Sequence, residues 1–286
     1  MDDRALLDTI RDLIGTEETA DDCASFELPD GTILVSSTDM LHETTDFPIG
    51  MTEFEKGWMS VAVTLSDIAS CGAQPIQVLA AVGLDDPKRL VPFMEGAVTC
   101  AKRFGAKIAG GDIDSHREFT VVTTGFGIVD KKFYCRRSGA SAGDAVCVTG
   151  TPGCAMAGLN GDERYRAHLL TPVPQVEAGQ LIARAGASSM MDVSDGLAIS
   201  LYDMSEASNV GFELDSSRFK LPDVSSGSAM EYYLYGGGDF GLLFCIPPAG
   251  LSGLDVKYTV LGNVVSEKGV WCDGKVLEKR GYAHHW

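Results

Sequence analysis

Five short stretches carry aspartates at candidate site positions, and in four of them the aspartate is beside glycine, serine or threonine. They are ADDCA (20–24), SSTDM (36–40), LSDIA (65–69), AGGDID (109–114) and DVSDG (192–196). At the ends of strands and helices backbone N–H groups are free, and side chains point into a common crevice. Carboxylate and hydroxyl oxygens are the ligands that Mg²⁺ prefers, usually together with substrate phosphates. The pattern therefore predicts a magnesium and phosphate site.

Each aspartate taken alone has a second interpretation as a cap. Asp22 and Asp39 could each close a turn, and Asp192 or Asp195 could be the N-cap of the following helix. Asp67 differs, because it lies in an apolar helical segment where an unpaired buried carboxylate is costly. We expect Asp67 to face either solvent or a cation.

Other site chemistries have little support in the sequence. The five histidines form no HxxxH or HExxH spacing, which argues against zinc or iron. There is no GxxxxGK[ST], no combined HRD and DFG set of a protein kinase, and no GxGxxG after a strand. The glycine turns in AGGDI and LYGGGDFG allow backbone N–H groups to approach a polyphosphate. Arg136 and Arg137 offer fixed positive charge for a phosphate, or form a solvated linker pair.

The elements that would position these residues alternate between strands and helices. In the first half we predict strand, helix, strand, helix, strand, strand at 31–40, 55–73, 76–84, 90–106, 107–112 and 119–129, with Gly72 as a helix C-cap. The basic, turn-rich run 131–144 then predicts a domain boundary near 138, giving domains 1–138 and 139–286. The second half predicts strands at 145–150, 188–193 and 210–215, helices at 151–159, 173–186 and 195–208, a glycine turn and buried strand within 233–247, and a meander over 258–278. The fold class is α/β (α+β) with two domains.

Charge and composition exclude several classes of partner. Forty acidic and 23 basic residues give a net charge of −17, which repels nucleic-acid phosphates and anionic membranes. No apolar stretch reaches the length of a membrane helix and the first residues lack a signal-peptide core, so we expect a cytoplasmic protein. The eight cysteines form no CxxC pair, and we expect reduced, mostly buried thiols.

The ordered motifs resemble those of the thiamine-monophosphate kinase family, particularly its archaeal type. They are ADDCA, VSSTDMLHETTDF, GWMSVAVTLSDIASCGAQP, AGGDID, RRSGASAGDAVCVTGTPG, MDVSDGLAISL, GGGDFGLLF and GYAHHW, in order from about residue 20 onward. That family is related to aminoimidazole ribonucleotide synthetase, selenophosphate synthetase and the hydrogenase maturation ATPase. The resemblance implies an N-terminal domain that binds ATP and dimerises through its sheet, and a C-terminal domain that closes over it. It also implies Mg²⁺-dependent transfer of phosphate from ATP to thiamine monophosphate, forming thiamine diphosphate.

The resemblance also implies site residues, motif by motif. The Mg²⁺ ligands would be Asp22, Ser37, Thr38, Asp39, Asp67, Asp112, Asp192 and Asp195. The nucleotide contacts would be Gly111, Asp112, Arg137 and Ser194. The thiamine contacts would be Asp46, Gly238, Asp239, Tyr282 and Trp286. No catalytic base is expected, because the acceptor phosphate has a second pKa near 6 and is largely ionised at neutral pH.

The chain departs from the family pattern at four positions. Ala20 replaces the usual glycine before the paired aspartates, Asp46 stands where bacterial members commonly have histidine, and glycines 238 and 241 stand where they have acidic residues. Three alternatives therefore remain: aminoimidazole ribonucleotide synthetase, selenophosphate synthetase, or a non-catalytic nucleotide-binding regulator.

Overall fold

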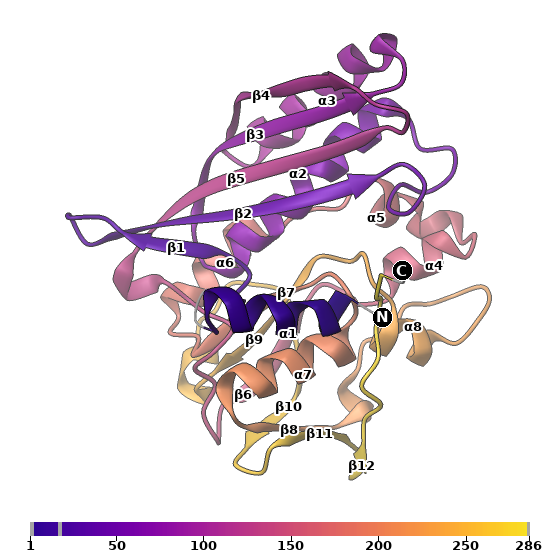
Figure 1. Cartoon of the computed structure of the whole chain (residues 1–286). Helices are drawn as coiled ribbons and strands as arrows, with labels where there is room; N and C mark the ends of the chain where they lie inside the picture. Colours follow the sequence, from indigo (N-terminus) through magenta and orange to yellow (C-terminus); the bar gives the residue numbers. More distant parts are fainter. Residues whose placement is uncertain (1–2, 17–18, 285–286) are drawn as a thin grey trace.

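The strands of the protein form two separate sheets. The computed structural model describes residues 3–16 and 19–284. All strands of the first sheet lie within residues 24–130, and all strands of the second within 145–276 (Figure 1). The boundary predicted near 138 falls in the segment that connects the sheets, and it stays a prediction. In the described part of the chain, no helix has the length and apolar character needed to cross a membrane.

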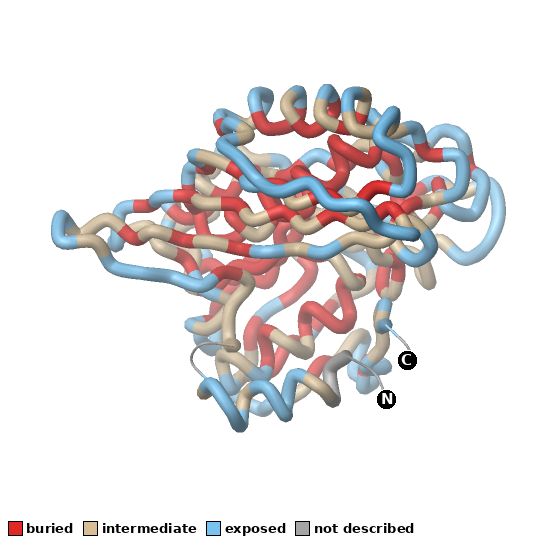
Figure 2. Tube along the Cα trace, turned by 45° about the horizontal axis from the view of Figure 1, so that its top comes forward, coloured by how far each residue is buried: buried red, intermediate tan, exposed pale blue. Residues whose placement is uncertain are grey.

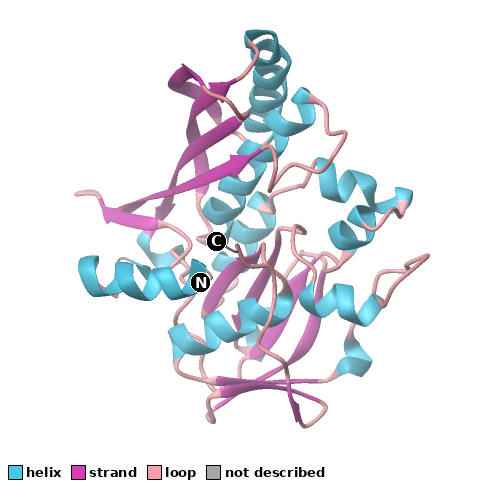
Figure 3. Cartoon of the chain, turned by 45° about the vertical axis from the view of Figure 1, so that its right-hand side comes forward, coloured by secondary structure: helices cyan, strands magenta, loops and turns pink. Residues whose placement is uncertain are grey.

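The first sheet has five strands in the order β1-β2-β5-β3-β4. They are β1 (Ala24–Glu27), β2 (Thr32–His42), β3 (Gln74–Leu84), β4 (Lys107–Ser115) and β5 (Thr120–Asp130). Helices α2 (Glu53–Ser70) and α3 (Leu90–Arg103) lie against one side of this sheet (Figure 3). The opposite side exposes apolar side chains, among them Phe26, Met40 and Ile128.

The second sheet has seven strands in the order β12-β11-β8-β10-β6-β9-β7. They are β6 (Ala145–Thr149), β7 (Ser189–Val193), β8 (Gly211–Leu214), β9 (Gly241–Ile246), β10 (Tyr258–Val265), β11 (Gly269–Cys272) and β12 (Lys275–Val276). The remaining α-helices are α1 (Asp3–Ile14), α4 (Cys154–Leu159), α5 (Arg166–Leu170), α6 (Val176–Arg184), α7 (Leu197–Ser208) and α8 (Ala229–Tyr235). Short 3₁₀ helices are η2 (Pro87–Arg89), η3 (Lys131–Phe133), η4 (Glu163–Tyr165), η5 (Ser216–Arg218) and η6 (Pro248–Leu251).

Helix α2 joins the two halves of the molecule. It begins with a capping box, in which the Thr52 hydroxyl accepts from the Glu55 N–H and the Glu55 carboxylate accepts from the Thr52 N–H. It contacts β2 and β5 of the first sheet and also α6 and β7 of the second part. Buried residues are accordingly concentrated in the middle of the molecule (Figure 2). A residue on α2 can therefore face a site that both halves share.

The predicted α/β alternation and the two-domain fold class are confirmed, but several local predictions are wrong. Helices α5 and α8 and strand β1 were not predicted because they are short, and the 12-residue helix α1 was not predicted although its apolar residues recur at helical spacing. The predicted meander is interrupted, since β8 lies between β10 and β11 and pairs in parallel with β11. Strand pairing between distant segments leaves no signal in local periodicity. Neither Asp192 nor Asp195 caps α7, whose N-cap is Gly196 at φ 114°.

Two glycines allow α2 and α3 to pack with their backbones in close contact. A Cβ at Gly57 would lie 1.9 Å from the Phe93 carbonyl oxygen, and a Cβ at Gly96 would lie 1.9 Å from the Phe54 carbonyl oxygen. Any larger side chain must push the helices apart, because the obstructing atoms belong to the backbone.

We predict that Gly96→Ala lowers the free energy of unfolding by about 1 to 3 kcal/mol, as expected for overpacking a close helix contact. Urea unfolding followed by circular dichroism measures the change. Thr99→Ala on the exposed face of α3 is the matched control and should stay within about 0.5 kcal/mol of the parent protein. Equal stability of Gly96→Ala and the parent would contradict the close approach.

Candidate active site between the two sheets

Five aspartates from distant elements approach one another between the two sheets, and we call them the aspartate cluster. They are Asp22 before β1, Asp39 in β2, Asp67 in α2, Asp192 in β7 and Asp195 after β7. Burial, followed by repulsion from Asp39, Asp192 and Asp22, raises the pKa of Asp67 well above its ordinary value. Burial and repulsion from Asp22, Asp39 and Asp195 do the same to the pKa of Asp192. The cluster therefore concentrates carboxyl groups whose ionisation is opposed by burial and by one another.

Hydroxyl groups hold the three central carboxylates. Thr64 Oγ1 donates to Asp39 Oδ2 at 2.6 Å, and Ser66 Oγ donates to Asp192 Oδ2 at 2.6 Å. Asp67 Oδ2 accepts a short hydrogen bond from Ser37 Oγ. The sequence prediction did not include Thr64 and Ser66, although both are hydroxyl residues flanking Asp67 in an otherwise apolar helix.

Strand geometry separates two neighbours in the SSTDM motif. Successive side chains of a strand point to opposite faces, so Ser37 and Asp39 face α2 whereas Thr38 faces the open side of the sheet. There Thr38 Oγ1 lies 3.0 Å from Thr124 Oγ1 of β5. This placement does not favour the Thr38 side chain as a metal ligand, and the prediction that Thr38 ligates Mg²⁺ stays a prediction.

Asp22 has an almost fully buried side chain, and it has an arginine partner. Arg137 Nη2 donates to Asp22 Oδ1, and the Arg137 backbone N–H donates to Asp21 Oδ1 at 3.0 Å. Asp22 Oδ2 and Arg137 Nε are buried without any hydrogen-bond partner. Burial and the adjacent Asp22 raise the pKa of Asp21 to about 6.

The donor set fits a hard divalent cation. Carboxylate and hydroxyl oxygens suit Mg²⁺, and the unpaired Asp22 Oδ2 offers a free ligand atom. Within residues 3–16 and 19–284, no three His, Cys, Asp or Glu side chains form a ready ligand set for a single ion. Water or substrate oxygens must therefore complete each coordination shell, which is how Mg²⁺ is usually bound.

Gly111 and Asp112 lie apart from the aspartate cluster, on the exposed edge strand β4. Asp112 lines a shallow pocket with Asp114 and His116. A Cβ at Gly111 would lie 1.7 Å from the Ala80 carbonyl oxygen, so only glycine fits there. The prediction that Asp112 ligates the same ions as the other aspartates is not supported by this placement.

The glycine turn and the C-terminal tail both approach the aspartate cluster. The Gly238 N–H donates to the Ser194 carbonyl at 2.7 Å, and the Tyr282 N–H donates to the Asp195 carbonyl at 2.8 Å. Trp286, the last predicted thiamine contact, lies outside the described residues.

The two acidic residues predicted to contact thiamine hold local backbone instead of standing free. Asp239 accepts from the N–H groups of Gly153 at 2.6 Å and Ala155 at 2.8 Å, and burial raises its pKa to about 6. Asp46 accepts from the His42 N–H at 2.7 Å, which closes the turn after β2.

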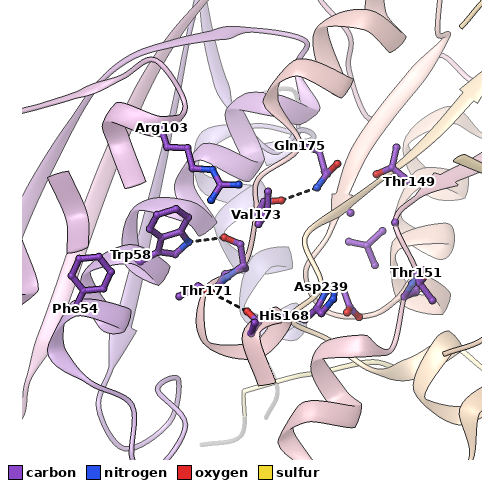
Figure 4. A pocket seen from close by; sticks show the side chains of 16 residues that line it. Phe54, Trp58, Arg103, Thr149, Thr151, His168, Thr171, Val173, Gln175 and Asp239 are labelled. Atoms are coloured by element: carbon purple, nitrogen blue, oxygen red, sulfur yellow. Dashed lines mark hydrogen bonds between the residues drawn. The ribbon is translucent and has the colours of Figure 1, made fainter. Parts of the chain in front are cut away.

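A cavity of about 400 Å³ lies between α2 and the strand ends of the second sheet. Figure 4 shows Phe54 and Trp58 on one wall and Thr151 and Asp239 on the other. Trp58 Nε1 donates to the Pro172 carbonyl at 2.8 Å and fixes that wall. The sequence alone does not mark Trp58 as a cavity residue, because an apolar helical period does not reveal which side chains border a cavity.

Comparison with known proteins defines the class. Residues 20–129 match the family model described as AIR synthase related protein, N-terminal domain, and residues 141–271 match the corresponding C-terminal domain. The thiamine-monophosphate kinase of Methanospirillum hungatei is 50% identical over 287 residues, with 100% of each chain covered. That of Archaeoglobus fulgidus is 40% identical over 267 residues, covering 88% of this chain and 86% of the relative. The solved structure of AaThiL complexed with AMPPCP and TMP is 26% identical with a TM-score of 0.92, covering 99% of this chain and 97% of the other.

The chain therefore belongs to the thiamine-monophosphate kinase family, and the resemblance seen in the sequence motifs is confirmed.

From the aspartate cluster we predict that Mg²⁺ raises the Tm of the protein more at high pH than at low pH. Asp67 and Asp192 of the cluster, whose pKa values are raised, and the neighbouring Asp21, whose pKa is about 6, keep their protons in the folded chain after the unfolded chain has lost them. The free energy of unfolding of the metal-free protein therefore falls as pH rises from about 4 to about 6. Mg²⁺ binds the ionised carboxylates and should offset this loss.

Scanning calorimetry with excess Mg²⁺ or EDTA at about pH 5 and about pH 8 checks this prediction. The difference in Tm between Mg²⁺ and EDTA is taken at each pH. This difference cancels the contribution of groups outside the cluster, such as Glu43, whose pKa the Arg89 ion pair lowers to about 2. A Mg²⁺-induced rise in Tm that is equal at both pH values would contradict it.

Proposed function

We propose that this protein transfers the terminal phosphoryl group of ATP to thiamine monophosphate, giving ADP and thiamine diphosphate. The observation that carries the proposal is the aspartate cluster, which draws buried carboxylates from both sheets to one place. Support also comes from the 50% identity to a thiamine-monophosphate kinase and from the fold shared with AaThiL complexed with AMPPCP and TMP.

The site must bring two polyanions together, ATP and the phosphate of the acceptor. The acceptor phosphate is already ionised near neutral pH, so the task of the protein is positioning and charge neutralisation without a catalytic base. Mg²⁺ held by the aspartate cluster and Ser37 would supply the positive charge that allows both phosphates to enter. The hydroxyls of Thr64, Ser66 and Ser37 orient the carboxylates, and Arg137 keeps Asp22 in place.

We propose that ATP extends from the aspartate cluster toward β4. Asp39, Thr123, Ala80 and Gly111 are register partners across four adjacent strands. At the usual strand spacing Gly111 lies about 14 Å from Asp39, a separation that an extended nucleoside triphosphate can span. Gly111 and Asp112 would then contact the nucleotide, while Arg137 and Ser194 contact its phosphates.

We place the thiamine portion of the acceptor beside the glycine turn and the C-terminal tail. Gly238 and Tyr282 are supported by their backbone bonds to residues 194 and 195. Asp239 and Asp46 would act mainly by shaping the backbone around the ligand, because their carboxylates already accept local N–H groups. Trp286 is kept as a proposed stacking partner on the resemblance alone.

Two further proposals concern the assembly and its location. The exposed apolar side chains on the open side of the first sheet support a homodimer formed through that face.

The proposed location is the cytoplasm. All eight cysteines are free, which is typical of proteins in a reducing cytoplasm.

Parallel acceptor assays test the proposed function against its rivals. We expect Mg²⁺-dependent ADP release with thiamine monophosphate, and none above background with formylglycinamidine ribonucleotide or selenide. Turnover with one of those two acceptors would assign the chain to another activity of the superfamily. ATP binding without acceptor-dependent turnover would favour a regulator.

Asp67→Asn should separate activity from stability. We expect kcat to fall about 100-fold or more, since neutralising charge at a metal-assisted transfer is worth several kcal/mol. The metal-free variant should nevertheless have a higher Tm than the parent near neutral pH, because the cost of burying a carboxyl group whose pKa is raised is gone. Steady-state kinetics and calorimetry measure the two effects.

The exposed Asp255→Asn is the matched control, and it should change neither quantity. A near-normal rate for Asp67→Asn would remove the central residue of the proposed site.

A further inference from the structure

One buried hydrogen bond links the two halves of the aspartate cluster across the seam between the sheets. Ser66 on α2 is 0% exposed and Asp192 on β7 is 4% exposed, and their side chains meet at 2.6 Å although they are 126 residues apart. Both groups are thus shielded from solvent, where a hydrogen bond to a carboxylate has its largest effect.

Ser66 gives the Asp192 carboxylate a favourable contact in an otherwise repulsive setting. Among the described residues, the Asp192 carboxylate accepts the hydrogen bond from Ser66, and the charges of Asp22, Asp39 and Asp195 act on it. All three are repulsive. Without the Ser66 hydroxyl, Asp192 would be a buried carboxylate surrounded by like charge.

The position of Ser66 on α2 explains why it contacts the second sheet and not the first. Neighbouring residues of a helix point about 100° apart, so Ser66 and Asp67 cannot face the same strand. Asp67 faces β2, where it accepts from Ser37, and Ser66 faces β7. One turn of α2 therefore touches carboxylates from both halves of the molecule.

We propose that Ser66 is a positioning residue that holds Asp192 Oδ2 and leaves the other carboxylate oxygen for a cation, so that metal binding is coupled to the docking of the two sheets. The inference rests on the proposed function in so far as that function requires Mg²⁺. Groups that hydrogen-bond metal ligands orient them, and their loss typically weakens metal affinity 10- to 100-fold. The contact also means that the cluster is complete only when α2 and β7 are packed together.

Direct titration of the full chain with Mn²⁺, followed by electron paramagnetic resonance of the free ion, tests the proposal without relying on turnover. Mn²⁺ takes the same oxygen ligands as Mg²⁺ and reports occupancy directly. We expect Ser66→Ala to raise the Kd for Mn²⁺ about tenfold or more. Ser60→Ala is the matched control, because Ser60 is equally buried on α2 but its hydroxyl bonds only to the Lys56 carbonyl.

A double-mutant cycle distinguishes positioning from a general structural effect. If Ser66 acts through Asp192, then adding Ser66→Ala to Asp192→Asn should not weaken Mn²⁺ binding further. A Kd for Ser66→Ala within about twofold of the parent, or an undiminished effect in the Asp192→Asn background, would overturn the role of Ser66 and leave the proposed kinase function standing. A parent protein that binds no Mn²⁺ either alone or with ATP present would overturn both, and circular dichroism of each variant in EDTA confirms that the chains compared are folded.

Discussion

The arrangement of this protein depends on holding several carboxylates close together away from water. Isolated burial of one such charge is unfavourable, and Asp67 and Asp192 each experience repulsion from other members of the cluster as well. The protein compensates with single hydroxyl donors and one arginine, which is too little to neutralise the group. What balances the remaining charge must come from outside the chain, and hard cations with their phosphate ligands are the chemical match.

Helix α2 connects this electrostatic requirement to the architecture. Its apolar residues pack against β2, β5 and α3, and close backbone contact at Gly57 and Gly96 fixes its position. Its polar residues Thr64, Ser66 and Asp67 emerge where the two sheets meet. The same helix therefore supplies the core of the first half and orients carboxylates of both halves.

A kinase whose acceptor is already a phosphate needs this kind of site more than it needs an acid or a base. The low histidine content and the absence of a nucleotide-binding glycine motif of the common types are consistent with such a reaction. Departures from the family at Asp46, Gly238 and Gly241 fall outside the aspartate cluster. They concern the part of the site that we propose recognises the organic portion of the acceptor.

The sequence by itself determined the order of most elements, the fold class and the family, because hydrophobic period and contiguous motifs are local properties of the chain. It also indicated Asp67, since a carboxylate within an apolar helical segment is conspicuous without any structure. Only the tertiary structure decided that Thr38 faces away from Asp39, that β8 separates β10 from β11, and that Ser66 meets Asp192. Those facts depend on strand register and on contacts between residues far apart in the chain, and no local pattern of residues encodes them.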